Sequence, residues 1–161
     1  MSKRERPVIE HLLALIDLFQ TGRVVPGRRP EDLLPEEEEL QAAREMMDFM
    51  EEMPGGFLIY QAGGNEEIIF ANRGLLRIFR CDTLEEFRRL TGNSFRGIVH
   101  PDDLAGVEES IQRQIAGSRF DLDYVEYRIT AKDGTIRWIE DYGHFVRSEI
   151  VGDVFYVFLV D

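Results

Sequence analysis

The stretch that most constrains the fold spans residues 124–139, where two runs rich in Val, Ile, Tyr, Thr and Trp flank Lys132-Asp133-Gly134. Runs that favour β-structure on either side of an Asp-Gly pair predict a β-hairpin. The turn explains this, because glycine adopts a positive φ without a Cβ clash and aspartate can bond to its own backbone. The chain is therefore expected to contain an antiparallel pair of strands here.

The type of turn decides which side chains of the hairpin face the core. A two-residue type I′ loop places Ile129 on the same face as Trp138. A three-residue loop, in which a type I turn is followed by a glycine bulge, shifts the second strand by one residue and places Ile129 with Ile139 and Asp141. The residues of the hairpin alone do not decide between these two turn types.

Length and charge narrow the classes of function. The 161 residues suffice for one domain and an appendage, and 43% hydrophobic with 31% charged residues is a globular composition. The net charge of −12 makes nucleic acid and anionic membranes poor partners, because both are polyanions. Residues 8–19 are fairly apolar, but Glu10, His11 and Asp17 interrupt them and no small-residue cleavage site follows, so we expect a cytoplasmic protein.

Residues 1–53 are predicted to form a helical extension. Apolar residues recur at the helical period between Pro7 and Gly22, a Pro- and Gly-rich linker follows, and a second helix runs from Pro35 to about Met53. Alternating steps of three and four residues mark an apolar seam on this second helix, made by Leu40, Ala43, Met47 and Met50. The seam suits a dimer interface, and it equally suits a helix that lies on its own domain.

The rest of the chain reads as strands, then helices, then strands. Short strands are predicted at 57–60 and 67–71, Asn72 is placed to cap the first of several short helices, and a longer helix spans 101–117. After the hairpin comes a last strand, Val154–Val160, which is apolar on both faces and therefore central or covered. This segregation predicts an α+β domain, an antiparallel sheet with helices on one face.

Three motifs in this order resemble a known family. They are the strand-to-helix run Ile68–Asn72, the helix start His100–Leu104 and the hairpin Arg128–Trp138. Residues 54–161 resemble the PAS sensory domains that share the His-Pro-Asp-Asp helix start and the Lys-Asp-Gly-x-x-Arg-Trp hairpin.

The resemblance implies a five-stranded antiparallel sheet in the order 2-1-5-4-3, with short helices that enclose a small pocket. It also favours the bulged turn, with Trp138 pointing outward. The pocket that this register predicts is lined by strand residues, with two lids from the helical side: Tyr127, Ile129, Ile139, Asp141, Val157 and Leu159, covered by Phe79 and Ile98.

PAS domains usually act as input modules of signalling proteins, so the resemblance implies a regulatory function. We expect a fragment of a bacterial two-component or cyclic-di-GMP signalling protein, whose effector is a diguanylate cyclase or a histidine kinase. The input is expected to be an unknown small molecule or partner, and the output is expected to pass through a homodimer of the leading helices.

Cofactor chemistry and catalysis find little support in the sequence. The stretch Asn93–Ile98, comparable to the cysteine motif of flavin photoreceptors, has no thiol, and the single cysteine, Cys81, falls in another helix. Haem ligation by His100 is disfavoured because this residue precedes a proline at the helix start, and no ligand spacing for a metal exists. Carboxylate pairs such as Asp102-Asp103 are explained by the helix dipole, so no catalytic residue is assigned.

Two functions remain in competition. An inward Asp141 must be paired or hydrogen-bonded, to a ligand or to Arg128 or Arg137, which favours a ligand sensor. Alternatively, apolar side chains fill the interior, and the domain is a ligand-free dimerisation or interaction module. The candidates for such filling are Phe57, Ile59, Tyr127, Ile129, Phe155, Val157 and Leu159.

Overall fold

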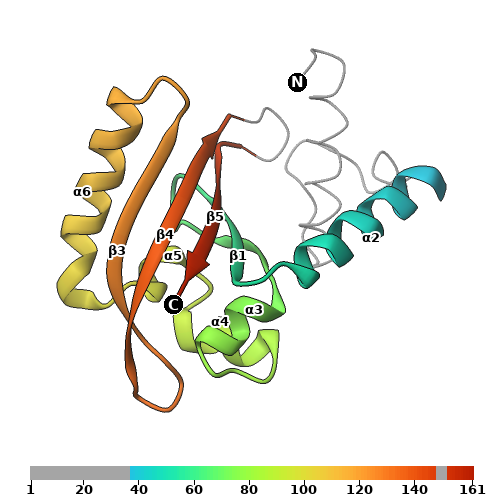
Figure 1. Ribbon diagram of the computed structural model, residues 1–161, viewed down its shortest axis with the longest axis horizontal. Helices are drawn as coiled ribbons and strands as arrows, with labels where there is room; N and C mark the ends of the chain where they lie inside the picture. The colour runs from blue at the N-terminus through green and yellow to red at the C-terminus, as the bar shows by residue number, and fades with distance from the viewer. Residues whose placement is uncertain (1–36, 148–151) are drawn as a thin grey trace.

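The structure is a computed structural model that describes residues 37–147 and 152–161 (Figure 1). The predicted first helix and the linker after it lie outside the described residues. The described chain begins with a helix and then forms the expected sequence of strands, helices and strands. Its elements are α2 (Glu37–Glu52), β1 (Gly56–Gln61), β2 (Ile68–Ala71), α3 (Arg73–Ile78), α4 (Leu84–Thr91), α5 (Phe95–Ile98), α6 (Pro101–Gly117), β3 (Leu122–Thr130), β4 (Ile136–Val146) and β5 (Val154–Val160).

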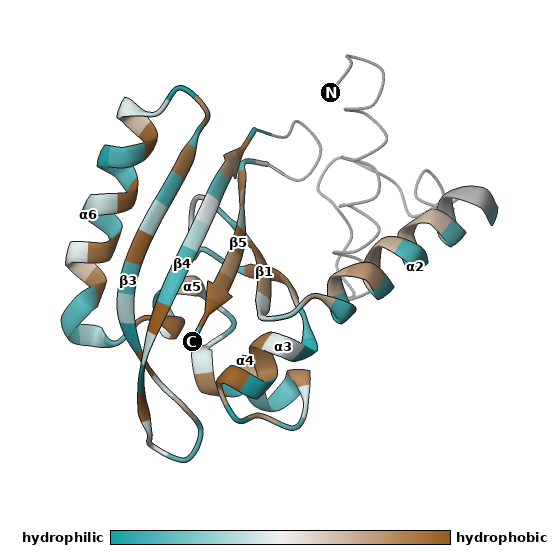
Figure 2. Ribbon diagram, viewed as in Figure 1, coloured by the Kyte–Doolittle hydropathy of each residue, from teal (hydrophilic) through white to brown (hydrophobic). Residues whose placement is uncertain are grey.

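The five strands form one antiparallel sheet in the order β2-β1-β5-β4-β3. This is the predicted fold class and strand order. The strand β5 lies in the middle of the sheet, as its continuous apolar run predicts, and Figure 2 shows it brown along most of its length. The strands β3 and β4 alternate between hydrophobic and hydrophilic residues instead, because one of their faces is exposed.

The hairpin between β3 and β4 has the bulged turn. Ala131 N–H donates to the Thr135 carbonyl at 2.9 Å, and Gly134 N–H donates to the Ala131 carbonyl at 2.9 Å. Gly134 has a φ of +85°, which an L side chain rarely adopts. The register that follows pairs Tyr127 with Ile139.

This register settles which hairpin side chains face the core. Tyr127, Ile129, Ile139 and Asp141 are all at most 1% exposed, whereas Trp138 is 64% exposed. The inward and outward assignments that the resemblance favoured are therefore confirmed.

Short helices on one face of the sheet enclose the main core. Side chains cap their starts: Asn72 Oδ1 accepts from Leu75 N–H, as the sequence predicts, and Thr83 Oγ1 accepts from Glu86 N–H. His100 Nδ1 accepts from Asp102 N–H at 3.2 Å at the start of α6, so its ring bonds to backbone there. Gly74 lets α3 approach β1, since a Cβ at this position would lie 1.9 Å from the Gly55 carbonyl oxygen.

The helix α6 runs beside β3 (Figure 1), and its side chains occupy the free edge of that strand. Gln114 bonds to both backbone groups of Tyr124, at 2.8 Å each, and Ser118 Oγ accepts from Leu122 N–H at 3.1 Å. At the other end of the strand, Asp103 Oδ2 accepts from Arg128 N–H at 2.9 Å. At Leu122, Tyr124 and Arg128, side chains of α6 and of its C-cap thus take the place of a further strand.

The other face of the sheet carries a smaller apolar cluster beneath the end of α2. Met50 is 4% exposed and packs with Ile59, Phe70 and Val154, and Met46 and Met47 lie against the same cluster. Phe57 belongs to it as well, so Phe57 and Ile59 do not fill the pocket side of the sheet. Successive residues of a strand point to opposite faces of the sheet. Leu58 and its partner Val157 face the main core, so Phe57 and Ile59 face the other side.

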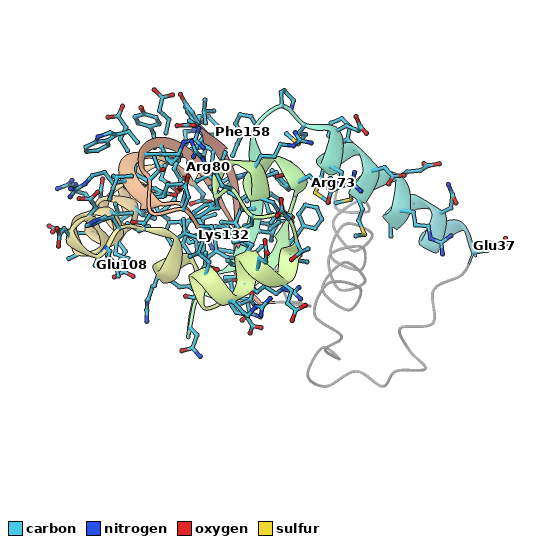
Figure 3. All side chains as sticks on the ribbon, turned by 90° about the horizontal axis from the view of Figure 1, so that it is seen from below. Glu37, Arg73, Arg80, Glu108, Lys132 and Phe158 are labelled. Atoms are coloured by element: carbon cyan, nitrogen blue, oxygen red, sulfur yellow. The ribbon has the colours of Figure 1, made fainter. Side chains whose placement is uncertain are left out.

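Asn72 ties α2 to the domain. Its side-chain amide donates to the Met50 carbonyl at 2.8 Å and to the Gly55 carbonyl at 3.3 Å, while Oδ1 also accepts from Phe57 N–H at 2.8 Å. The remainder of α2 extends away from the domain toward Glu37 (Figure 3). Within the described residues, none of the helices has the length and apolar character needed to cross a bilayer.

Candidate functional site

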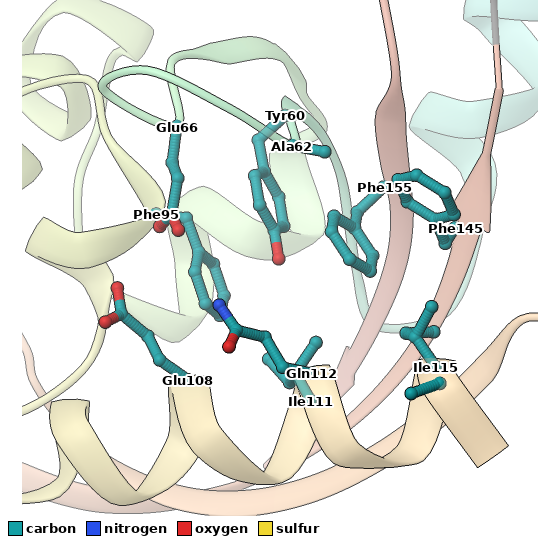
Figure 4. Close-up of a pocket in the computed structure, with 11 residues that line it drawn as sticks. Tyr60, Ala62, Glu66, Phe95, Glu108, Ile111, Gln112, Ile115, Phe145 and Phe155 are labelled. Atoms are coloured by element: carbon teal, nitrogen blue, oxygen red, sulfur yellow. The ribbon is translucent and has the colours of Figure 1, made fainter.

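A partly open cavity of about 330 Å³ lies between α6 and the sheet (Figure 4). It is bounded by the ends of β1, β4 and β5, by the start of α5, and by one side of α6. Most of its walls are apolar or aromatic: Tyr60, Ala62, Phe95, Ile111, Ile115, Ala116, Phe145 and Phe155. Three polar side chains complete it: Glu66, Glu108 and Gln112. The size is at the small end of ligand pockets.

A stack of aromatic rings forms one wall of the cavity. The ring of Tyr60 lies between Phe95, at 4.4 Å between centroids, and Phe155, at 5.1 Å, and both pairs are nearly parallel. Phe145 continues the wall at 5.2 Å from Phe155. Interlocked rings of this kind move little, so the wall is preformed.

The hydroxyl of Tyr60 points into the cavity (Figure 4). Tyr60 is 3% exposed, and its hydroxyl makes no hydrogen bond with the residues that the structure describes. Burial raises its pKa well above the usual value, so the hydroxyl is a neutral donor and acceptor. The hydroxyl oxygen opens to the cavity, so it is free to donate to or accept from a molecule bound there.

One end of the cavity is acidic. Glu66 and Glu108 face each other there (Figure 4), and Arg96 lies 3.2 Å from Glu108 Oε1 and 3.7 Å from Glu66 Oε2. Burial and the charge of Glu108 raise the pKa of Glu66, while Arg96 opposes the shift. Glu66 Oε2 is buried and accepts no hydrogen bond within the described structure. Two carboxylates therefore share one guanidinium.

The eight pocket residues expected from the sequence form a different part of the interior. All of them are at most 2% exposed, and the seven other than Asp141 belong to the main core cluster. The structure brings them together, but none of them lines the cavity, whose walls lie closer to α6. That these eight residues contact a ligand stays a prediction. The cavity itself is lined by other residues.

Asp141 is buried, and its partner is not an arginine. Tyr127 donates a hydrogen bond of 2.6 Å to Asp141 Oδ2, whereas Arg128 pairs with Asp103. Arg137 donates to the Ile78 carbonyl at 2.9 Å and pairs with Asp161 at the end of β5. The expected arginine partners are thus engaged elsewhere. Burial raises the pKa of Asp141 to about 8, although the Tyr127 hydrogen bond lowers it.

A second carboxylate, Asp123, lies on the same inner face, opposite Gly143. Its Oδ2 is buried and has no hydrogen-bond partner in the described residues. Burial raises the pKa of Asp123 to about 6. A Cβ on Gly143 would lie 2.4 Å from this oxygen, so the absence of a side chain at position 143 makes room for the carboxylate.

The residues weighed for cofactors have local roles. Cys81 is buried, its Sγ lies 3.7 Å from the Phe79 carbonyl oxygen, and burial raises the pKa of its thiol, so it is a neutral thiol. His100 caps α6. In the described part of the chain, no three His, Cys, Asp or Glu side chains group around a common point that could hold a metal ion.

The seam predicted on α2 contacts the domain over its last two turns. Met47 and Met50 pack on the outer apolar cluster, and Ala43 is fully buried and contacts Met46. The side chain of Leu40 lies outside the described residues. Phe49, on another side of the helix, is 70% exposed. At Met47 and Met50, α2 therefore lies on its own domain. Dimerisation through this helix stays a prediction.

Sequence reasoning did not identify the cavity walls. Tyr60, Phe95 and Phe155 come from three separate segments, and only the packing of the sheet against α5 brings their rings together. A signal existed on α6, where Glu108, Ile111 and Ile115 recur at steps of three and four residues and therefore share one side of the helix. The two isoleucines of this series predict that this side of α6 is buried, but they do not predict that a cavity lies beside it.

The fold and the cavity define an α+β domain in which a five-stranded sheet and short helices enclose a small site. The chain belongs to the PAS-fold family, because the model of that family matches residues 68–157, more than half of the sequence. None of the curated proteins is significantly similar to it in sequence.

Solved PAS structures share the fold. A PAS domain from a two-component sensor histidine kinase matches with a TM-score of 0.60 and 14% identity, over 77% of this chain and 98% of that one. The PAS domain of an HTR-like protein from Haloarcula marismortui matches with a TM-score of 0.58 and 18% identity, over 77% and 94%. An RNA-binding Light-Oxygen-Voltage receptor matches with a TM-score of 0.59 and 15% identity, over 85% of this chain and 36% of that receptor.

Proposed function

We propose that this domain is a sensory input module that binds a small molecule in the cavity beside α6 and passes the binding event to an effector. The observation that carries the proposal is the Tyr60 side chain, which is only 3% exposed and whose hydroxyl points into preformed space without a hydrogen bond to the described residues. PAS domains are typically regulatory and not catalytic. We expect a histidine kinase or a diguanylate cyclase as the effector, and the neighbouring structure from a sensor histidine kinase supports only the first of these.

The sheet offers a route from the cavity to both ends of the domain. Tyr60 and Phe155 belong to β1 and β5, which pair directly, and Gly56 at the start of β1 pairs with Leu159 near the end of β5. The helix α2 enters β1 at this point, and Asn72 holds its last turn there. A ligand that shifts β1 against β5 would thus displace α2 and the segment after β5 together.

The test is ligand binding by the full chain with a cavity-filling variant. A compound that binds only the folded state raises the melting temperature, so a metabolite library can be screened by thermal shift. Ala116 and Ala105 are both exposed positions of α6, but only Ala116 lines the cavity, so Ala116→Trp places a large ring at the cavity rim and Ala105→Trp makes the same change away from it. We expect hits that Ala116→Trp abolishes and Ala105→Trp keeps. A library without hits, or hits indifferent to both variants, would refute this function.

A ligand-free dimerisation module is the second candidate, and the exposed face of β3 and β4 favours it. Leu122, Tyr124, Trp138 and Tyr142 are between 39% and 64% exposed and lie on the outer face of the two strands, where the Glu126–Glu140 pair separates Trp138 from the paired Tyr124 and Tyr142. Exposed aromatic side chains of this kind are enriched in protein interfaces. The mass of the full chain in solution tests it: a homodimer that Trp138→Ser dissociates supports this face, and one that Phe49→Ser dissociates supports α2.

A further inference from the structure

The acidic end of the cavity carries an excess of negative charge. Arg96 is shared by two carboxylates, and its side chain is 52% exposed, so much of its charge is solvated. The side chains of Glu66 and Glu108 are 15% and 33% exposed. The carboxylates are therefore less hydrated than the cation that balances them, and one guanidinium balances two of them.

The Arg96 guanidinium also lies outside the cavity, although the two carboxylates that it balances line it. Glu66 and Glu108 line the cavity, whereas Arg96 does not. Arg96 Nε donates to Glu108 at 3.2 Å, but no hydrogen bond reaches the buried Oε2 of Glu66 from the residues that the structure describes. An N–H donor that arrived from the cavity would satisfy this oxygen.

The opposite end of the cavity is apolar. Ile115 of α6 and Phe145 of β4 face each other there, and Phe155 lies between them and Tyr60 (Figure 4). The cavity therefore has two ends of different chemistry, and a ligand that fits both must carry a positive charge at one end and an apolar group at the other.

From this geometry we propose that the cavity binds a small monocationic amphiphile, an amine carried on a compact apolar or aromatic body. The ammonium group lies between Glu66 and Glu108, the body stacks along the Tyr60–Phe155 wall toward Phe145, and the Tyr60 hydroxyl and Gln112 supply polar contacts between the two ends. This assignment rests on the proposed function, since it names the ligand class for the same cavity.

A salt-bridge cluster alone does not account for the site. Two glutamates and an arginine on a surface commonly stabilise only each other. Here, however, Tyr60 is an independent feature: its side chain is only 3% exposed, and its hydroxyl, which the cluster does not reach with a hydrogen bond, points into the same space. Anionic compounds are disfavoured, because a carboxylate or phosphate would meet two carboxylates at the only polar end of this cavity.

Three probes of the same shape isolate the charge. 2-Phenylethylamine is a cation, 2-phenylethanol is neutral and 3-phenylpropanoate is an anion. Titration calorimetry with the full chain at neutral pH measures all three. We expect the amine to bind about tenfold or more tightly than the alcohol, as one charge-assisted hydrogen bond would give, and the anion to bind worst. Added salt should weaken only the amine.

Charge-neutral variants locate the contact. Glu66→Gln and Glu108→Gln are each expected to weaken the amine about tenfold and to leave the alcohol within about twofold. Glu109→Gln makes the same change at the next residue of α6, which is exposed and does not line the cavity, so it is expected to bind all three probes as the unmodified chain does. Equal weakening by Glu109→Gln would overturn the assignment.

Other outcomes separate this inference from the proposed function. Amine and alcohol of equal affinity, or a preference for the anion, would show that the ligand class is wrong. The same follows if none of the probes binds but a neutral or anionic library compound does, and then the sensor function stands. If no compound binds and Ala116→Trp changes nothing, both the ligand class and the sensor function are wrong.

Discussion

The phenol of Tyr127 donates a 2.6 Å hydrogen bond to Oδ2 of Asp141 inside the core, and both side chains are at most 1% exposed. An ionised carboxylate at this depth would have one neutral donor and, among the residues that the structure describes, no cation beside it. The protein therefore stabilises the protonated acid, and the pKa of Asp141 rises to about 8. Stability must depend on pH for this reason.

We expect the free energy of unfolding to fall as pH rises from about 4 to about 8. In this window the unfolded chain has released the Asp141 proton and the folded chain still holds it, so folding takes up a proton. One such group contributes a slope of at most roughly 1.4 kcal/mol per pH unit. The substitution Asp141→Asn removes this contribution to the slope. Urea unfolding across this range should show a flatter profile for the variant than for the unmodified chain.

Asp123 provides an internal check on that profile. Its pKa of about 6 predicts that the Asp141→Asn variant keeps a decline in the free energy of unfolding between about pH 4 and 6. Asp153→Asn, at an exposed position, should leave the original profile unchanged. A variant at Asp141 whose slope equals that of the unmodified chain would show that the buried carboxylate does not hold its proton.

Gly143→Ala should destabilise the domain through Asp123. The new methyl group would lie 2.4 Å from Asp123 Oδ2, so the carboxylate or the strand must shift, at a cost of about 1–3 kcal/mol. Asp123→Ala removes the obstacle. In a double-mutant cycle by urea unfolding, Gly143→Ala should cost much less in the Asp123→Ala background. Additive effects would mean that the two positions do not collide.

Asn72→Ala should loosen α2. The side chain of Asn72 is fully buried and bonds to four backbone groups in three segments, so its loss is expected to cost about 2–4 kcal/mol. Asn72→Ser keeps a cap for α3 but cannot reach Met50. We expect it to be intermediate in stability, while hydrogen exchange in the last turn of α2 accelerates as much as in Asn72→Ala. Unchanged exchange in both variants would exclude Asn72 as the tie.

Asp103→Asn should weaken the attachment of α6 to β3. Arg128 bonds to both carboxylate oxygens of Asp103, at 3.0 and 2.6 Å, and holds the pKa of Asp103 down at about 2. The pair is partly exposed, so its loss should cost only about 1 kcal/mol at neutral pH. This difference should shrink as pH falls from about 4 to 2, where the native carboxylate takes up its proton. Asp102→Asn, at the exposed neighbouring position, serves as the control, and an equal effect there would indicate a helix-dipole contribution alone.

The sequence predicted those elements whose pattern is unambiguous. The last strand and the long helix occur over Val154–Val160 and Pro101–Gly117 as expected, because an apolar run and a proline start with a glycine end define them locally. The hairpin needed the family resemblance as well. Its residues allow two turns, and only the register of the whole sheet selects the bulge at Gly134.

The rest depended on packing between distant segments. The run 57–60 is apolar at each position, so its period could not show that Leu58 and Tyr60 face the cavity side while Phe57 and Ile59 face α2. The partner of Asp141 was missed for a related reason: a neutral tyrosine two pairs along the hairpin satisfies it, and charge matching points to arginines instead. Open space is a property of side-chain volumes from several segments, which no local pattern encodes.

The helix-covered edge of β3 has a consequence for how copies of this protein can meet. Unpaired strand edges are templates on which sheets of neighbouring molecules fuse, and this is how many β-rich proteins aggregate. Gln114, Ser118 and Asp103 already occupy the backbone groups that such fusion would need at Tyr124, Leu122 and Arg128. At high protein concentration, the chains should therefore resist edge-to-edge pairing through β3 and remain free to associate face to face.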